Sequence, residues 1–247
     1  MALVTPRLPR LFVERDLDAS SLALDERESH YLGHVLRLTR GDALIAFNGR
    51  GAERHATVNS LQRRGAILDL QAEYSPLPES SLDLTLVQAL AKSDAMDLIV
   101  QKATELGARA IVPVYTEFSV VRLDAERGLR RLEHWRRITE SACEQCGRHR
   151  PPAIGPPELL AAALEGLSGD GARYALQPSA DRSFDKEEAP VGPLVVAVGP
   201  EGGFGAMDWR RLESARFARV ALGRRVLRAE TAAIAVCAIA QSRWGDL

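Results

Sequence analysis

From residue 82 onward, the sequence alternates between apolar strand-like segments and amphipathic helix-like segments. The segments LDLTLVQAL and AIVPVYT read as buried strands, and DAMDLIVQKATELG between them places apolar residues at helical spacing and ends at Gly107. A long helix is expected at 124–147, and further strands are expected at RYALQ, PLVVAVG and FARVALG. The alternation predicts an α/β fold with a parallel sheet, helices on both faces, and ligand loops at the carboxyl ends of the strands.

The residues before this region follow a different pattern. The segments RLFVE, ALIAFNGRG, RHATVNSLQ and GAILDLQAEY are short, have strand character and are separated by turns, with one early helix expected at 26–38. The stretch SPLPESS, at 75–81, contains two prolines and three serines and reads as a linker. We therefore predict a small β domain at 1–73 and an α/β domain at 74–247.

Composition excludes several classes of protein. The chain has 247 residues, 46% of them hydrophobic, and a formal net charge of −1. It contains no uninterrupted apolar run of membrane-spanning length, so we expect a cytoplasmic protein without a membrane partner. Arginines concentrate at 127–150 and 205–228, where they form either solvated helix faces or surfaces that meet nucleic acid.

Cys143 and Cys146 form a C-x-x-C pair near the end of an expected helix. A zinc site needs two further ligands at suitable spacing, and none of the five histidines pairs with another in a finger-like pattern. A redox pair would lie at the start of a helix, where the helix dipole lowers a thiol pKa. Reduced structural thiols, and no metal, are the expectation.

A glycine-rich loop, Gly199-Pro200-Glu201-Gly202-Gly203, follows one apolar strand and precedes a helix expected from Ala206. It lacks both the G-x-G-x-x-G of dinucleotide sites and the Gly-Lys-Ser/Thr of a P-loop. Pro200 has no N–H for a phosphate, and Glu201, which we expect to be buried, would repel one. A plain tight turn would account for the glycines but not for the glutamate, so the loop suits a neutral or cationic ligand that approaches the backbone closely.

A second loop, ALGRRVLRAETA at 221–232, leads into a helix that contains the apolar run AAIAVCAIA. A helix that is apolar on all sides must be covered everywhere, either in the core of the domain or at a subunit interface, and we favour partial burial in a homodimer. Glu230 and Thr231 lie in its expected first turn, where they suit capping and interaction with the helix dipole.

VGPEGGF followed by LGRRVLRAETAA resembles the ligand-binding signature of the SPOUT methyltransferases. The chain is most similar to the RsmE family of 16S ribosomal RNA uridine-N3 methyltransferases, and the likeness includes RLPRLFVE, HYLGHVLRLTRGD, KSDAMDLIVQKATELG and EQCGR. The resemblance implies a SPOUT-type parallel sheet with a carboxyl-terminal trefoil knot and a small amino-terminal PUA-like β-barrel domain. It also implies S-adenosylmethionine as cofactor and 16S ribosomal RNA of the small subunit as partner.

The resemblance implies a cofactor site built mainly from backbone groups of three loops. Its residues here would be Leu176, Gly199, Pro200, Glu201, Gly202, Gly203, Leu222, Gly223, Leu227, Arg228, Glu230 and Thr231. Uridine N3 carries a proton that must leave as the methyl group arrives. We assign Arg228 to stabilise the negative charge that develops on the uracil, and Glu230 or Glu201 to accept the proton.

The expected RNA contacts are basic residues in motifs that match the family: Arg7, Arg10, Arg37, Lys92, Lys102 and Arg148. Asp94, Glu105, Glu144 and Gln145 lie in the same motifs, although amphipathic helices expose such residues without any functional role.

The chain departs from the family pattern at two positions, where Ala95 and Phe118 replace arginines. Both changes remove positive charge from the expected RNA side, and Phe118 could stack on a base instead. Two alternatives stay open. One is an RNA-binding ribosome-assembly factor without turnover, and the other is a SPOUT methyltransferase that acts on another RNA position.

Overall fold

The structure is a computed structural model that describes residues 8–62, 65–75, 78–119, 121–167 and 169–247. The chain folds into two compact units. The first comprises the described residues up to Glu79 together with Cys143–Pro151, and the second comprises Ser80–Ala142 and Pro152–Leu247. The segment Cys143–Pro151 therefore groups with residues far from it in the sequence.

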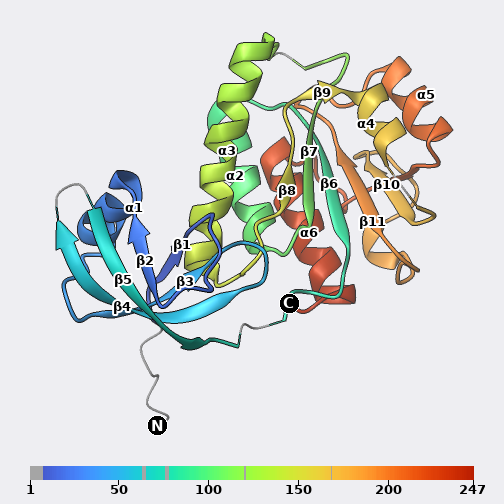
Figure 1. Cartoon of the computed structure of the whole chain (residues 1–247). Coiled ribbons are helices and arrows are strands. Elements are labelled where there is room, and N and C mark those ends of the chain that lie inside the picture. The colour runs from blue at the N-terminus through green and yellow to red at the C-terminus, as the bar shows by residue number, and fades with distance from the viewer. Residues whose placement is uncertain (1–7, 63–64, 76–77, 120, 168) are drawn as a thin grey trace. The chain divides into compact units, whose positions relative to one another are not determined.

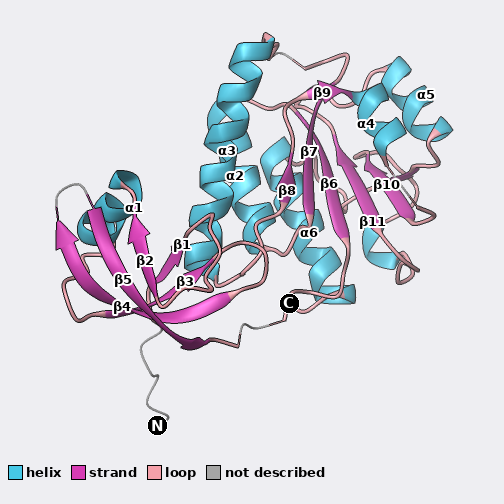
Figure 2. Cartoon of the chain, viewed as in Figure 1, coloured by secondary structure: helices cyan, strands magenta, loops and turns pink. Residues whose placement is uncertain are grey.

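The first unit is built on a five-stranded sheet with the order β1-β3-β4-β5-β2. β1 pairs with β3 in parallel and the other pairs are antiparallel, and Figure 2 shows long, strongly curved strands β4 and β5. Leucine and valine side chains such as Leu11, Leu44 and Leu68 fill its core. The strands are β1 (Arg10–Phe12), β2 (Ser21–Leu24), β3 (Ala43–Phe47), β4 (Glu53–Gln62) and β5 (Gly65–Glu73).

The early helix is shorter than expected and changes type along its length. α1 (Glu26–His30) begins with a capping box, in which the Asp25 side chain accepts from the Glu28 N–H and the Glu28 side chain accepts from the Asp25 N–H. A π-helical turn, Tyr31–Val35, continues it. Arg37, at φ 57°, lies just beyond in the left-handed region and ends the helical conformation before the expected residue 38.

A buried ion pair between Arg10 and Glu53 connects β1 to β4. The two residues are 6% and 2% exposed, and the Arg10 guanidinium also donates to the carbonyl oxygen of Arg148 at 3.1 Å. Nearby, the Phe12 N–H donates to the Glu144 carboxylate at 3.0 Å, and the Arg148 Nε donates to Glu79 at 2.8 Å. These bonds explain why Cys143–Pro151 belongs to the first unit.

The second unit contains the predicted parallel sheet, with the order β12-β10-β11-β6-β7-β8 and with β9 paired to β7. All of its strand pairs are parallel, which confirms the prediction. The strands are β6 (Leu84–Ala89), β7 (Ala110–Tyr115), β8 (Ala153–Ile154), β9 (Glu158–Leu159), β10 (Ala172–Leu176), β11 (Leu194–Val198) and β12 (Ala218–Val220).

Helices cover both faces of this sheet, as Figure 1 shows. Alternate residues of β11 enter two cores: Val196 packs in the core that includes α2 and α6, and Ala197 packs in the core that includes α4 and α5. The elements are α2 (Ser93–Glu105), α3 (Ala125–Cys146), α4 (Leu160–Gly166), the 3₁₀ turn η2 (Phe184–Lys186), α5 (Ala206–Ser214) and α6 (Ala229–Trp244).

Sequence reasoning missed five short elements, namely β2, β8, β9, α4 and the 3₁₀ turn η2. β8 and β9 have two residues each, so they carry no periodicity, and tertiary pairing to β7 alone defines them. In the expected linker 75–81, Pro76 and Leu77 lie outside the described residues. The expected domain boundary at residue 73 stays a prediction.

The thiols of Cys143 and Cys237 are buried and form no disulfide. Burial raises the pKa of each to about 12, and so high a thiol pKa at Cys143 does not suit a redox role for the C-x-x-C pair to which it belongs. Within the described ranges, no cluster of three or more His, Cys, Asp or Glu side chains could hold a metal ion. In that same part of the chain, no helix is long and apolar enough to cross a membrane.

Loss of the buried ion pair should destabilise the first unit. Glu53→Gln removes one charge and leaves the Arg10 guanidinium buried without its counter-ion, at an expected cost of about 3–5 kcal/mol in the free energy of unfolding. The matched control is Asp16→Asn, which breaks the Asp16–Arg50 pair, whose side chains are 76% and 58% exposed, and should cost about 0–1 kcal/mol. Urea unfolding monitored by circular dichroism measures both variants, and equal costs would contradict the assigned role of the buried pair.

Candidate functional site

The carboxyl ends of the parallel strands bring distant loops together at one edge of the second unit's sheet. β10, β11 and β12 end at Leu176, Val198 and Val220, and β10 lies between the other two. Because the three strands run in the same direction, the loops that follow them leave the sheet at the same edge. This arrangement places the two glycine-containing loops of the sequence beside each other.

The loops after β10, β11 and β12 enclose a cavity of about 250 Å³. Eight of the twelve expected cofactor residues line it: Leu176, Gly199, Pro200, Glu201, Gly202, Gly203, Leu222 and Leu227. Gly223, Arg228, Glu230 and Thr231 do not line it. The remaining lining residues, which sequence reasoning missed, are Gln177, Pro178, Val198, Arg225, Val226, Ala229 and Ala232.

Two glycines of the first loop meet a steric requirement. Gly203 has φ 72° and its N–H donates to the Pro200 carbonyl oxygen at 2.8 Å, which closes a tight turn. A β-carbon on Gly199 would lie 3.1 Å from the carbonyl carbon of Gly203. A side chain at Gly199 would therefore crowd the returning backbone, whereas at Gly203 the positive φ, and not a lack of space, favours glycine. Glu201 is exposed, so the expectation that it is buried was wrong.

The second loop leads into α6, which begins at Ala229 with Arg228 as its N-cap. No side chain among the described residues caps the helix, so the expected capping role of Glu230 and Thr231 was wrong. Glu230 is half-buried in the first turn, and Arg228 and Thr231 are exposed. Ala229 and Ala232 are small, and their positions on the first turn leave room for the cavity.

Helix α6 is only partly covered within the described chain. Ala233, Val236, Cys237 and Ala240 are buried against the sheet and α2, in the core of the second unit. Ala232 and Ile239 are partly buried against the same core, and Ile234, Ala235 and Ala238 are half-exposed. The expectation that the whole helix is covered is therefore met on one side of the helix only.

The expected RNA contacts have different environments. Arg37 and Lys92 are exposed, and Lys102 makes an ion pair with Glu105 at 2.8 Å. Arg10 is buried against Glu53, and the Arg148 side chain, 12% exposed, contacts Glu79. Arg7 lies outside the described residues.

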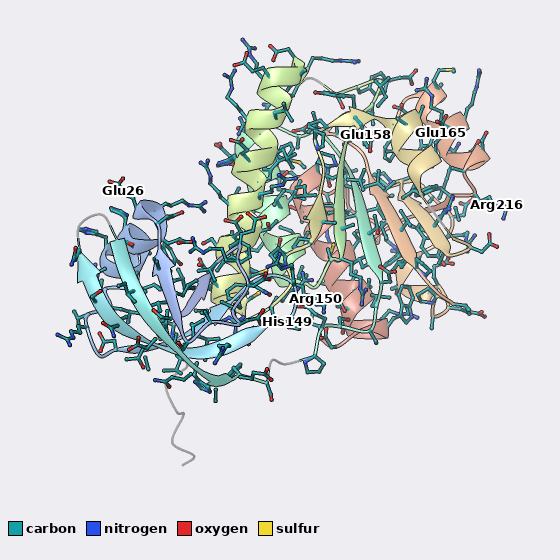
Figure 3. All side chains as sticks on the ribbon, viewed as in Figure 1. Glu26, His149, Arg150, Glu158, Glu165 and Arg216 are labelled. Carbon is teal, nitrogen blue, oxygen red and sulfur yellow. The ribbon has the colours of Figure 1, made fainter. Side chains whose placement is uncertain are left out.

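A larger hollow of about 480 Å³ lies before β10, near Asp170, Arg173 and Arg216. Arg173 uses its guanidinium to bind the carbonyl oxygens of Leu167, Gly169 and Ala215. Arg216 lies on the surface in Figure 3, and its side chain is 85% exposed. This hollow lies at the amino ends of the strands, whereas ligands of such sheets bind at the carboxyl ends.

The lining residues that the sequence did not predict are of types that do not by themselves indicate a ligand-binding site. Ala229 and Ala232 look like ordinary helix residues, and they reach the cavity only because α6 starts beside β11. Gln177 is the last residue of the expected strand RYALQ and Pro178 follows it directly, so the rule that ligands bind at the carboxyl ends of strands could have found both.

The RNA methyltransferase domain model matches residues 78–241, and the RNA methyltransferase PUA domain model matches residues 24–71. A crystal structure of ribosomal RNA small subunit methyltransferase E from Neisseria gonorrhoeae, bound to S-adenosylmethionine, is 32% identical. It matches with a TM-score of 0.90 over 98% of this chain and 100% of that chain. A methyltransferase from Legionella pneumophila, solved with the bound cofactor SAM, is 30% identical with a TM-score of 0.92 over 98% and 100% of the two chains.

Among the curated relatives, ribosomal RNA small subunit methyltransferase E of Mycobacterium tuberculosis is 31% identical, over 94% of this chain and 92% of the relative. The neighbours agree with a SPOUT-type α/β unit joined to a PUA-like unit. The chain belongs to the ribosomal RNA small subunit methyltransferase E family of RNA methyltransferases.

Proposed function

We propose that this protein transfers a methyl group from S-adenosylmethionine to N3 of a uridine in 16S ribosomal RNA. The observation that carries the proposal is the cavity between the loops after β10, β11 and β12, which eight expected cofactor residues line. Two solved relatives that match nearly the whole chain hold S-adenosylmethionine, which supports the same cofactor here.

The residues around the cavity fit this cofactor better than a phosphate-rich nucleotide. Leu176, Leu222 and Leu227 supply apolar walls that suit an adenine ring. The N–H groups in the first turn of α6 are available to a carboxylate, and the exposed Glu201 carboxylate favours a positive charge at the edge of the cavity. The cofactor supplies an electrophilic methyl group.

Residues of the chain would then stabilise the negative charge that develops on the uracil and accept the proton that leaves N3. Arg228, exposed at the start of α6, stabilises the negative charge that develops on the uracil. Glu230, half-buried in the first turn of the helix, or the exposed Glu201 accepts the N3 proton, directly or through water. Because N3 lies on the pairing edge, a paired target base must be exposed before it can react.

Exposed basic residues would hold the RNA. Arg37 and Lys92 are free to contact phosphate, and Lys102 can do so beside Glu105. Direct contact by Arg10 or Arg148 would first require breaking an ion pair, so we assign both a positioning role within the first unit. Arg7 keeps its expected role as a further contact.

The two expected domains would have different roles in this reaction. The small domain at 1–73 binds RNA, and the domain at 74–247 carries the chemistry and the trefoil knot. The half-exposed side of α6 supports a homodimer, because exposed apolar helix faces are typical of subunit interfaces. We expect the protein to act in the cytoplasm on the small ribosomal subunit, without a metal.

Methylation of defined RNA tests the function directly. Small-subunit RNA from a strain that lacks the gene, treated with the purified protein and labelled S-adenosylmethionine, should gain one 3-methyluridine, detected by mass spectrometry of nuclease fragments. RNA from the parent strain, already modified, should gain none. Binding without transfer would favour the assembly factor, and a methyl group at another atom would favour a different target.

Arg228→Ala should lower kcat in the same assay. Loss of a group that stabilises developing charge costs about 10²–10³-fold in kcat, and the dissociation constant for S-adenosylmethionine should change less than about 2-fold, because Arg228 does not line the cavity. The control is Arg216→Ala, an 85% exposed arginine that precedes β12 at the opposite edge of the sheet, lies outside the cavity lining and should retain activity. Turnover within a few-fold of wild type for Arg228→Ala would remove that residue from the mechanism.

A further inference from the structure

Phe118 has the most exposed aromatic side chain in the part of the chain that the structure describes. It is 53% exposed, whereas Tyr74, the next, is 37% exposed. The phenylalanines of both units are otherwise buried or half-buried. A single exposed apolar side chain is common on protein surfaces, so its meaning depends on how it is held and on what lies beside it.

Phe118 is carried on a rigid turn, Thr116–Ser119, that directly follows β7. The Thr116 N–H donates to the Ser119 Oγ at 3.0 Å, and the two hydroxyl oxygens lie 2.9 Å apart. The Ser119 N–H donates back to the Thr116 carbonyl oxygen at 3.2 Å. Thr116 and Ser119 are buried, so the turn fixes its ends and presents the Phe118 ring between them.

The same turn is attached to the start of α5. The buried carboxylate of Asp208 accepts from the Glu117 N–H at 2.9 Å and from the Gly205 N–H at 3.1 Å. The Glu117 carboxylate in turn accepts from the Met207 N–H at 3.1 Å. Together these hydrogen bonds hold the turn against the end of the glycine-rich loop.

This attachment places Phe118 next to the cavity. A β-carbon on Gly202, a lining residue, would lie 3.2 Å from the Cβ of Phe118. The loop after β12, which lines the same cavity, carries three arginines and no acidic residue before α6, and this favours an anionic polymer over a neutral partner at that side of the cavity. The three arginines are Arg224, Arg225 and Arg228.

We infer that Phe118 is a stacking platform for a base of the RNA substrate, at or next to the base that is methylated. The inference rests on the proposed function and names a specificity-determining residue for it. An unpaired base exposes two π-faces, and an aromatic side chain, which has only two side-chain torsions, can cover one of them with little loss of side-chain entropy. The Phe118 ring would thereby orient the pairing edge of the base toward the cavity.

The test separates aromatic stacking from simple apolar contact. Phe118→Leu keeps an apolar side chain and removes the π-face, and Phe118→Trp keeps and enlarges the π-face. With unmodified small-subunit RNA as substrate, Phe118→Leu should raise KM for RNA about 5- to 100-fold. Phe118→Trp should stay within about 3-fold of wild type, and both should bind S-adenosylmethionine as wild type does in calorimetry.

Val191→Ala is the matched control. Val191 is 91% exposed and precedes β11, at the opposite edge of the sheet, so its KM for RNA should equal that of wild type. Light scattering of each variant reports the oligomeric state, which should not change. Folding is checked by circular dichroism, and retained cofactor binding shows that the cavity is intact.

Equal KM values for wild type, Phe118→Leu and Phe118→Trp would overturn the inference alone, since methyl transfer would still occur. A changed oligomeric state in Phe118→Leu would overturn it too, because the ring would then belong to a subunit interface. A wild-type protein that binds the cofactor but transfers no methyl group would overturn the proposed function, and this inference with it.

Discussion

The parallel direction of the strands in the second unit determines where a ligand can bind. Because β10, β11 and β12 run the same way, their following loops meet at one edge, although 44 positions separate Leu176 from Val220 in the numbering. Gly199 and Gly203 then allow the backbone to fold back tightly at that edge. The cavity and the Phe118 turn both depend on this arrangement, because Asp208 and Gly202 belong to the same loop and helix start.

The first unit depends on a different interaction, the buried pair of Arg10 and Glu53. A buried guanidinium needs a counter-charge, which the Glu53 carboxylate supplies, and its Nη2 donates to Glu53 and to the Arg148 carbonyl oxygen. Its buried Nε has no hydrogen-bond partner among the described residues. The same arginine thus holds the segment after α3 to β1 and β4. Arg10 lies in a motif that we expected to contact RNA, but its side chain packs within the first unit.

Much of the second unit could be predicted because its signals are local. Apolar strands such as LVVAV and the helical spacing in α2 follow directly from periodicity, and the glycine-rich loop is visible in the sequence. The two-residue strands β8 and β9 could not be predicted, because only pairing with β7 creates them.

The site was predictable to a similar extent. Backbone-rich loops at strand ends were found, but the lining by Ala229 and Ala232 depends on where α6 begins. The exposure of Glu201 was misjudged because one charged residue between glycines gives no information about which side of the loop faces solvent. Burial of Arg10 was also invisible, since its partner Glu53 is 43 positions away.

The central claim is that the cavity beside α6 holds the methyl donor, and one calorimetric comparison tests it. Ala232→Leu adds volume at the cavity wall, and Ala162→Leu adds the same volume at an exposed position of α4, outside the lining. S-adenosylmethionine should bind Ala232→Leu at least about 10-fold more weakly than wild type, a loss of ~1.4 kcal/mol or more, and should bind Ala162→Leu normally. Equal affinity for Ala232→Leu and wild type would contradict the account.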